Sequence, residues 1–261
     1  MTAAELYKAG KLQDAIAAQT QEVKGQPADQ NKRLFLFELL AFAGEFERAT
    51  KQMDVLKYDQ IELQTAATAY RRLLDGETKR RQLFTQGLKP EFFVDAPQHV
   101  ALRLEAINRL RENKPAEAKE LLDRANAGVV PLKGTLNGKP FESLRDADDL
   151  FAGVLEVLAH GVYHWVPLEQ VEAVSMKPPR FPRDLLWVPA RLEMEASAGD
   201  VFLPALYPNS HAHADDQVKL GRTTDWKETP GGPVLGLGLR TFLAGDDASS
   251  LLEWRSLQIT R

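Results

Sequence analysis

The chain has 261 residues, 44% of them hydrophobic, no cysteine, and 33 basic against 37 acidic side chains. The lack of cysteine excludes a disulfide framework, cysteine-based zinc sites and a thiol nucleophile, and the net charge of −4 argues against a dedicated nucleic-acid surface. We find neither an apolar leader nor a run of about 18 apolar residues, so we expect a cytoplasmic protein without membrane contact, built from one large or two medium domains.

A repeat in the first half predicts helical hairpins. Residues 9–15 (AGKLQDA) recur as residues 43–49 (AGEFERA), and a looser copy at 112–118 (ENKPAEA) carries Asn113 in place of the glycine. The first two copies lie 34 residues apart, which is the tetratricopeptide period, with a turn glycine between two helices and a small alanine where they approach. We predict a tetratricopeptide-like α-helical superhelix over residues 1–128.

Aromatic residues and a basic cluster lie within this half. Stacked helix pairs form a concave surface that commonly binds a peptide or helix, and Phe35, Phe37, Phe42 and Phe46 either lie near such a groove or form the core between the helices. The basic cluster at residues 71–81 is interrupted by acidic side chains, so we expect a solvated helix face and no nucleic acid partner.

The pattern changes after residue 127. Gly128 and Pro131 form a helix stop signal, and the Asn-Gly pair at 137–138 suits a type I′ hairpin turn. We therefore place a domain boundary here and expect a helical domain at 1–128 and a second domain at 129–261.

One main helix is predicted in the second domain. Residues 143–146 (SLRD) resemble a capping box. The apolar residues that follow at helical spacing are Ala147, Leu150, Phe151, Val154, Leu155 and Leu158. This pattern predicts an amphipathic helix over residues 144–160, with the acidic group at 146–149 in its first turn.

Period-two patterns follow and predict strands. The candidate strands are residues 171–176, 186–194, 201–207, 235–243 and 252–259, the last with a phase change that would mark a bulge. Pro189 and Pro204 cannot donate to a ladder, so we expect their strands at edges or bulges. The fold class is therefore multidomain α+β, with a mostly antiparallel, curved sheet and one main helix in the second domain.

Catalytic motifs are scarce. The sequence contains neither a Gly-x-Ser-x-Gly elbow nor a phosphate-binding loop. On a strand, His211, His213 and Asp215 would share one face and could hold zinc, with Asp216 beside them, although the preceding residues resemble a loop. A metal-dependent hydrolase is one alternative function; otherwise we expect no enzyme, no metal and no cofactor.

Eight short segments in the second half carry a family resemblance. They are LNGKPF at 136–141, RDADD at 145–149, LEVL at 155–158, GVYHWVP at 161–167, PRDLLW at 182–187, LPALYP at 203–208, LGRTTDW at 220–226 and GLG at 236–238. In this order they resemble the ImpE family, whose members are also called TagJ or SciE-type proteins.

The resemblance implies an accessory protein of the bacterial type VI secretion system. It implies two partners: the small subunit of the contractile sheath, bound through a helical segment at that subunit's N-terminus, and the ClpV-type AAA+ ATPase that disassembles contracted sheaths. It also implies no catalytic activity. A generic peptide-binding co-chaperone is a further alternative, because helical repeats are reused widely.

Polar residues beside turn formers in the matching segments are candidates for partner recognition. They are Arg183, Asp184, Tyr207, Arg222, Asp225 and Trp226. The alternative is structural, with Arg183 and Arg222 paired to Asp184 and Asp225 so that they hold loops in place.

Overall fold

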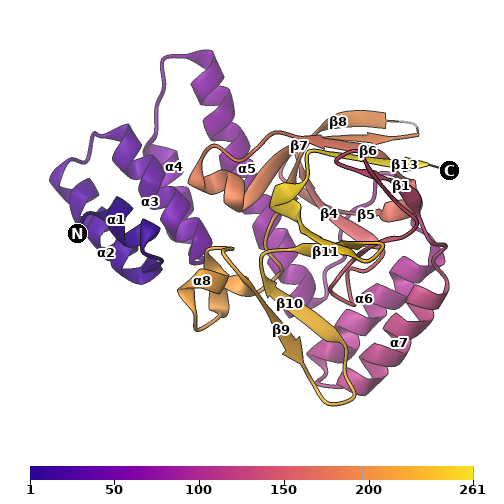
Figure 1. Ribbon diagram of the computed structural model, residues 1–261. Coiled ribbons are helices and arrows are strands. Elements are labelled where there is room, and N and C mark those ends of the chain that lie inside the picture. The colour runs from indigo at the N-terminus through magenta and orange to yellow at the C-terminus, as the bar shows by residue number, and fades with distance from the viewer. Residues whose placement is uncertain (196, 261) are drawn as a thin grey trace.

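The computed structural model describes residues 1–195 and 197–260, and it has helices in its first half and strands in its second (Figure 1). The helices are α1 (Ala3–Lys8), α2 (Leu12–Gly25), α3 (Gln30–Phe42), α4 (Phe46–Val55), α5 (Ile61–Gln86), α6 (Gln98–Arg111), α7 (Pro115–Ala127) and the short α8 (Asp216–Lys219). The strands are β1 (Lys133–Leu136), β2 (Lys139–Phe141), β3 (Leu144–Asp146), β4 (Val154–Ala159), β5 (Val162–Pro167), β6 (Val171–Met176), β7 (Trp187–Met194), β8 (Ser197–Pro204), β9 (Thr224–Glu228), β10 (Val234–Gly238), β11 (Thr241–Ala244), β12 (Asp247–Ser250) and β13 (Ser256–Thr260). Ala196 and Arg261, both in the range predicted as a second domain, lie outside the described residues. The mixed α+β class is confirmed.

Helical hairpins form where the repeat predicts turns. Gly10 between α1 and α2, Gly44 between α3 and α4, and Asn113 between α6 and α7 have positive φ angles of 75°, 69° and 59°. Glycine adopts this conformation without strain, and asparagine is among the few other residues that tolerate it. The turn signal in the repeat is therefore confirmed at all three copies, while the long helix α5 separates the second hairpin from the third.

The main sheet is antiparallel. Its eight strands follow the order β2-β1-β13-β6-β7-β8-β4-β5, beside a three-stranded sheet β12-β11-β3 and a β9–β10 ribbon. The predicted type I′ turn is present at residues 137–138, with φ angles of 52° and 78°. A second two-residue turn at His160 and Gly161, also with positive φ angles, joins β4 to β5.

The predicted helix over residues 144–160 is wrong. This segment forms β3, a series of turns, and β4, so residues 129–195 and 197–260 lack the one main helix that we expected. Every residue of β4 is buried, which removes the polar and apolar alternation that marks a strand. The apolar residues of the turns that precede β4, read together with those of β4 itself, recur at a spacing that resembles a helix.

Two further strand expectations need correction. Pro189 lies in β7, an interior strand, at a position just past the last β6–β7 pair, Met176 and Ala190. Its missing N–H therefore costs no bond to β6. The phase change near residue 254 is not a bulge, because the 3-10 turn η4 (Leu251–Glu253) precedes β13.

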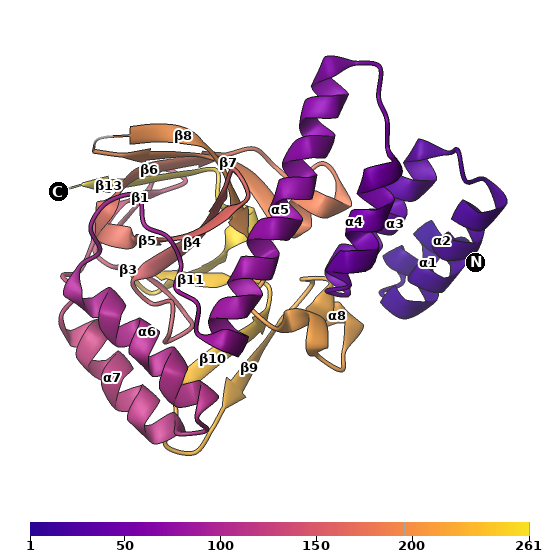
Figure 2. The same cartoon turned by 180° about the vertical axis from the view of Figure 1, so that it is seen from behind.

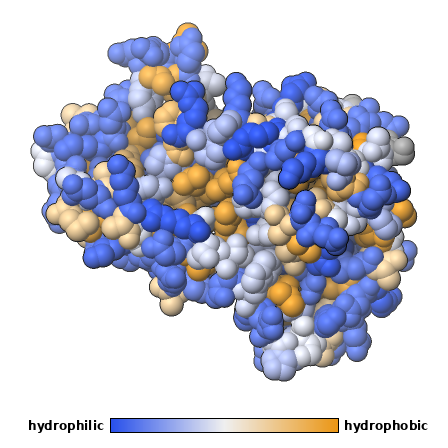
Figure 3. Space-filling view, in the orientation of Figure 1, coloured by the Kyte–Doolittle hydropathy of each residue, from blue (hydrophilic) through white to orange (hydrophobic). Residues whose placement is uncertain are grey.

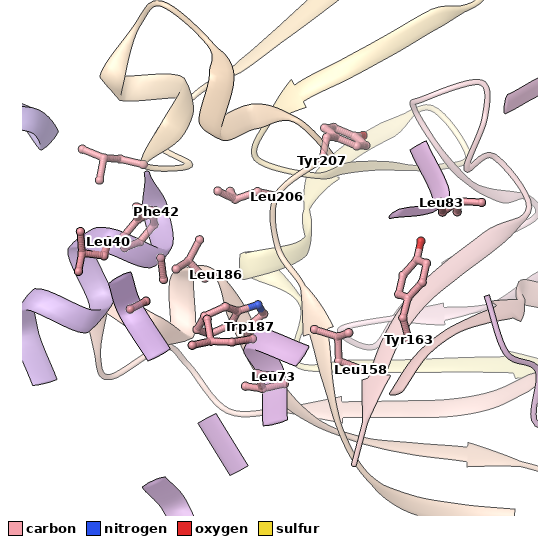
Figure 4. Close-up of a cluster of buried hydrophobic side chains, with 14 of the residues drawn as sticks. Leu40, Phe42, Leu73, Leu83, Leu158, Tyr163, Leu186, Trp187, Leu206 and Tyr207 are labelled. Atoms are coloured by element: carbon pink, nitrogen blue, oxygen red, sulfur yellow. The ribbon is translucent and has the colours of Figure 1, made fainter. Parts of the chain in front are cut away.

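The hydrophobic core has two parts. One lies between the eight-stranded and three-stranded sheets and contains Phe242 and Trp254, whose ring centroids are 4.4 Å apart. The other joins the helices to β4, β5 and the start of β7, with α5 crossing the molecule between them (Figure 2). Figure 4 shows Leu40 and Phe42 of α3 facing Leu186 and Trp187 across this contact. The apolar interior is thus shared by both halves of the chain.

Two glycine substitutions separate backbone strain from steric contact. Gly44→Ala and Gly138→Ala both place a side chain at a positive φ, a cost of about 1–2 kcal/mol. At Gly138 a Cβ meets nothing within 4 Å, whereas at Gly44 it would lie 2.5 Å from the ring of His211. We expect Gly44→Ala to lower the free energy of urea unfolding by about 1–3 kcal/mol more than Gly138→Ala does. Equal losses would contradict the contact at Gly44.

Candidate functional site

A buried ion pair links α5 to the main sheet. Arg80 of α5 donates from Nε and Nη2 to the two carboxylate oxygens of Glu156 in β4, at 2.8 and 2.7 Å. Arg80 is 6% exposed and Glu156 1%. Nη2 of Arg80 also donates to the carbonyl oxygen of Leu206 at 2.7 Å, and Nη1 lies 3.3 Å from Glu77. This fork geometry satisfies charges that would be costly to bury alone.

A second buried arginine extends the cluster. Arg240 donates to Glu156 and, at 2.8 Å, to Oδ2 of Asp146, whose Oδ1 accepts from the hydroxyl of Tyr207 at 2.6 Å. The hydroxyl of Tyr163 also donates to Glu156. We call the set Glu77, Arg80, Asp146, Glu156, Tyr163, Tyr207 and Arg240 the buried ionic network.

Charge compensation determines the ionisation of the network. Burial alone would raise the pKa of Glu156, but Arg80 and Arg240 outweigh it and hold that pKa below its usual value. Burial raises the pKa of Asp146 despite the charge of Arg240. The carboxylates thus neutralise both arginines inside the fold, and the network is a structural joint between α5 and the strands.

The acidic group at 146–149 does not cap a helix, as we had expected. Asp148 instead accepts backbone N–H bonds from Leu150 at 2.8 Å and from Gly236 at 2.7 Å, which fixes the turn before β4 against β10. Burial and the neighbouring charge of Asp146 raise the pKa of Asp148 to about 7.

Residues 209–226, which we call the docking segment, contact the turns of the first two helical hairpins. A Cβ added to Gly10 would lie 1.8 Å from Nε2 of Gln217, and one added to Gly44 would lie 2.5 Å from Cδ2 of His211. The turn glycines therefore give the helices their reversal and also let the docking segment approach the backbone closely.

The docking segment also supplies hydrogen bonds to the helix ends. Helix α2 has no side-chain cap of its own, and Oδ2 of Asp216 accepts the N–H of Leu12 at 2.8 Å. Arg222 donates to the carbonyl oxygens of Tyr7 and Lys8 at 2.5 and 3.0 Å, where the C-terminal carbonyls of α1 favour a cation. These bonds join residues more than 200 positions apart.

The three residues considered for a metal have separate roles. The strand that would align them is absent: His211 lies in the 3-10 turn η3 (Ser210–Ala212), and Asp215 caps α8 by accepting from the N–H of Gln217. Nε2 of His213 lies 3.1 Å from Asp225. Within residues 1–195 and 197–260, no three His, Asp or Glu side chains are grouped to hold a metal ion. The hydrolase alternative gains no support from this geometry.

His211 should remain uncharged at neutral pH. Burial first, and then the charges of Arg81 and Arg80, lower its pKa from 6.5 to about 4. A lowered histidine pKa contributes stability that is present above pH 6.5 and is lost as the pH falls through 4. We expect NMR of the imidazole groups to show one ring, absent in His211→Gln, that protonates near pH 4. Arg81→Gln should raise the pKa of His211. If the His211 ring of the unmodified protein instead protonates near pH 6.5, that result would contradict its packing.

The predicted recognition residues mostly serve the contact between helices and strands. Arg183 does not pair with Asp184; it donates to Glu38 of α3 at 2.6 Å and lies over the ring of Tyr70, with its Cζ 4.8 Å from the ring centroid. Asp184 is buried and accepts the backbone N–H of Phe181 at 3.1 Å. Asp225 and Arg222 likewise hold other partners. The expected pairs of Arg183 with Asp184 and of Arg222 with Asp225 are therefore wrong, and a role of these residues in partner recognition stays a prediction.

The aromatic candidates are partly or fully buried. Phe42 and Tyr207 are each 1% exposed, while Phe35, Phe46 and Trp226 are half-buried. The cavity beside Phe42 and Phe46 has a volume of about 50 Å³, room for water but not for a helix. Phe42 and Phe46 therefore line a small internal cavity, while partner binding by Phe35, Phe46 and Trp226 stays a prediction.

Sequence reasoning missed the buried ionic network. We interpreted Arg80 as part of a solvated basic face, but it is buried against Glu156, 76 positions away in the chain. A signal was present, because Glu156 is the one charged residue in a strand that is otherwise apolar.

Comparisons with known proteins identify the family. The family described as "ImpE protein" matches residues 138–258. The chain is also 33% identical over 258 residues to the "Type VI secretion system accessory component TagJ" of Pseudomonas aeruginosa (strain PAO1). This alignment covers 98% of this chain and 90% of the relative. The chain belongs to the ImpE family. A crystal structure of the protein VPA1032 from Vibrio parahaemolyticus shares the fold, with a TM-score of 0.91 and 24% identity over 99% of this chain and 97% of that chain.

The ImpE match contains only part of the joint described above. Asp146, Glu156 and Arg240 lie inside residues 138–258, whereas Arg80 lies in α5, outside the matched range. The similarity to TagJ covers both parts. Among the described residues of this ImpE-family chain, no helix has the length and apolar character needed to cross a bilayer.

Proposed function

We propose that this protein is a non-enzymatic, cytoplasmic accessory component of a bacterial type VI secretion system, and that it binds a helical segment at the N-terminus of the small contractile-sheath subunit. The observation that carries the proposal is the similarity to TagJ, which extends over 98% of this chain and includes both the helices and the strands. A whole-chain match supports a shared role more strongly than a match to one part would.

The geometry supports a binding role over catalysis. The buried carboxylates and arginines bond to one another and to the backbone, so they are committed to the joint between α5 and the strands. The proposal also has a structural part. We propose that the chain divides at residue 128 into two domains and that the helical hairpins of the first are tetratricopeptide-like.

The proposal also includes a second partner, the ClpV-type AAA+ ATPase. The bound protein would connect this ATPase to the sheath.

Peptide binding is tested by fluorescence anisotropy. The labelled N-terminal segment of the cognate small sheath subunit is titrated with the full-length protein, and a scrambled peptide of the same composition serves as the control. We expect saturable binding of the native peptide alone. Equal affinity for the scrambled peptide would favour a generic co-chaperone, and no binding of either would overturn sheath capture.

The ATPase link is tested by a second titration. Purified ClpV-type ATPase is added to the complex of protein and labelled peptide, and the proposal predicts a further rise in anisotropy. An unchanged signal at saturating ATPase would remove this partner while leaving sheath binding in place.

A further inference from the structure

A wide groove runs along the outer face of β7 and β8, beside α5. Its apolar lining residues include Tyr70, Met176, Pro178, Phe181, Pro189 and Phe202. Its volume is about 600 Å³, within the range of 300–1,000 Å³ typical of ligand pockets. We call it the α5–β8 groove. Figure 3 shows apolar residues gathered along the middle of one face, where the helices meet the strands, and at the projecting end of α5.

The apolar wall of the groove continues along α5. Tyr70 packs on Phe202 with ring centroids 6.0 Å apart. Leu63 and Ala67 lie seven and three positions before Tyr70, which places all three on one face of the helix. Leu63 is 43% exposed, and Phe181, which lines the groove, is 46% exposed. A partner lying in the groove and along α5 would cover both apolar side chains.

The floor of the groove excludes strand addition. β7 and β8 pair along their whole length, from Trp187 with Pro204 to Met194 with Ser197, and their other edges face β6 and β4. β7 pairs with β6 as far as Ala190 and β8 pairs with β4 at Phe202, so both strands are interior to the sheet and neither offers a sheet edge to a partner. An occupant must bind through its side chains, and the matching mode is an amphipathic helix in an apolar groove.

The charges on the rim determine the polarity of that helix. Lys177 and Arg180 are exposed on the segment that follows β6 and have no ion-pair partner among the described residues. Arg191, also on the rim, is already shared between Glu193 and Asp200, and Asp184 accepts backbone N–H bonds. The unpaired charge at the groove is thus positive.

We propose that the α5–β8 groove binds an amphipathic helix with apolar side chains at i, i+3, i+4 and i+7 and carboxylates beside them. The inference rests on the proposed function, because the groove would be the binding site for the helical segment of the sheath subunit. The carboxylates approach Lys177 and Arg180, and the apolar face covers Phe181, Phe202 and the exposed wall of α5.

The test uses full-length variants and two labelled peptides. The first probe is the native sheath peptide, and the second is a designed amphipathic helix with leucines on one face and flanking glutamates. Lys177→Glu with Arg180→Glu reverses the rim charge; Lys139→Glu with Lys227→Glu, at exposed positions outside the groove lining, is the control with the same net charge. Phe181→Ser removes an apolar wall, and its control is Leu88→Ser, which is 50% exposed.

We expect both groove variants to bind each peptide roughly tenfold more weakly than their controls do, and we expect salt to weaken binding to the unmodified protein. If the sheath peptide binds all variants equally, the groove is wrong while sheath capture stands. If the sheath peptide does not bind the unmodified protein, the proposed function fails. The designed helix then tests the groove alone: binding that weakens when the rim charge is reversed supports the groove, and no binding of the designed helix overturns it.

Discussion

Trp187→Ala is expected to lower the free energy of unfolding by about 3–5 kcal/mol, the usual cost of removing a large buried aromatic side chain. The indole is 1% exposed and stacks on Phe37 of α3, with ring centroids 6.2 Å apart. Its Nε1 also donates to Glu77 at 3.0 Å, so the substitution leaves a cavity beside a carboxylate that has lost a donor. Urea unfolding followed by far-ultraviolet circular dichroism measures the loss.

Two controls separate packing from the hydrogen bond. Trp187→Phe retains an aromatic ring against Phe37 but removes the donor to Glu77, so it should cost about 1–3 kcal/mol. Trp226→Ala removes a half-buried indole that packs on Tyr207 and should cost less than Trp187→Ala. Equal losses for Trp187→Ala and Trp226→Ala would show that the contact between α3 and β7 is not a main source of stability.

Glu156→Gln is expected to be similarly severe, because the charge that compensates Arg80 and Arg240 is lost inside the protein. Removing one partner of a buried ion pair typically costs about 3–5 kcal/mol, since the remaining charge stays buried. Both arginines bond to this carboxylate, which is 1% exposed. The measurement is again the free energy of unfolding in urea.

An exposed glutamate in the same sheet provides the matched control. Glu193 in β7 pairs with Arg191 at 3.3 Å, and both side chains are about half exposed, so Glu193→Gln should change stability by less than about 1 kcal/mol. Comparable effects at Glu156 and Glu193 would contradict the buried ionic network. A large loss at Glu156 alone would show that the network holds α5 on the sheet.

Local signals in the sequence were sufficient for the turns. Gly10 and Gly44 were recognised from the repeat, and the Asn-Gly turn at 137–138 from its composition, because each conformation depends on the residues at that position. The strand at 171–176 was also predicted, since buried Val174 and Met176 alternate with exposed Ser175. The buried strand β4 was not, because its neighbours on both faces come from distant parts of the chain.

The contacts between the two halves could not be predicted in the same way. Asp216 caps a helix 204 positions earlier, and Arg183 pairs with a glutamate 145 positions earlier. No local pattern marks such partners, because any of the 37 acidic side chains could satisfy an arginine. Only the identity of the turn glycines gave a hint that another segment approaches the helical hairpins closely.

The docking segment and Trp187 also determine when the helices can become stable during synthesis. Phe37 emerges from the ribosome 150 residues before Trp187, which at 5–20 residues per second is a delay of roughly 8–30 s. In that interval the apolar faces of α3 and α5 lack the strands that cover them, and α2 lacks the cap from Asp216. The nascent chain therefore presents apolar helix surface to the cytosol until most of its length has been translated. Chaperones of the kind that bind unfinished chains would recognise this exposed surface.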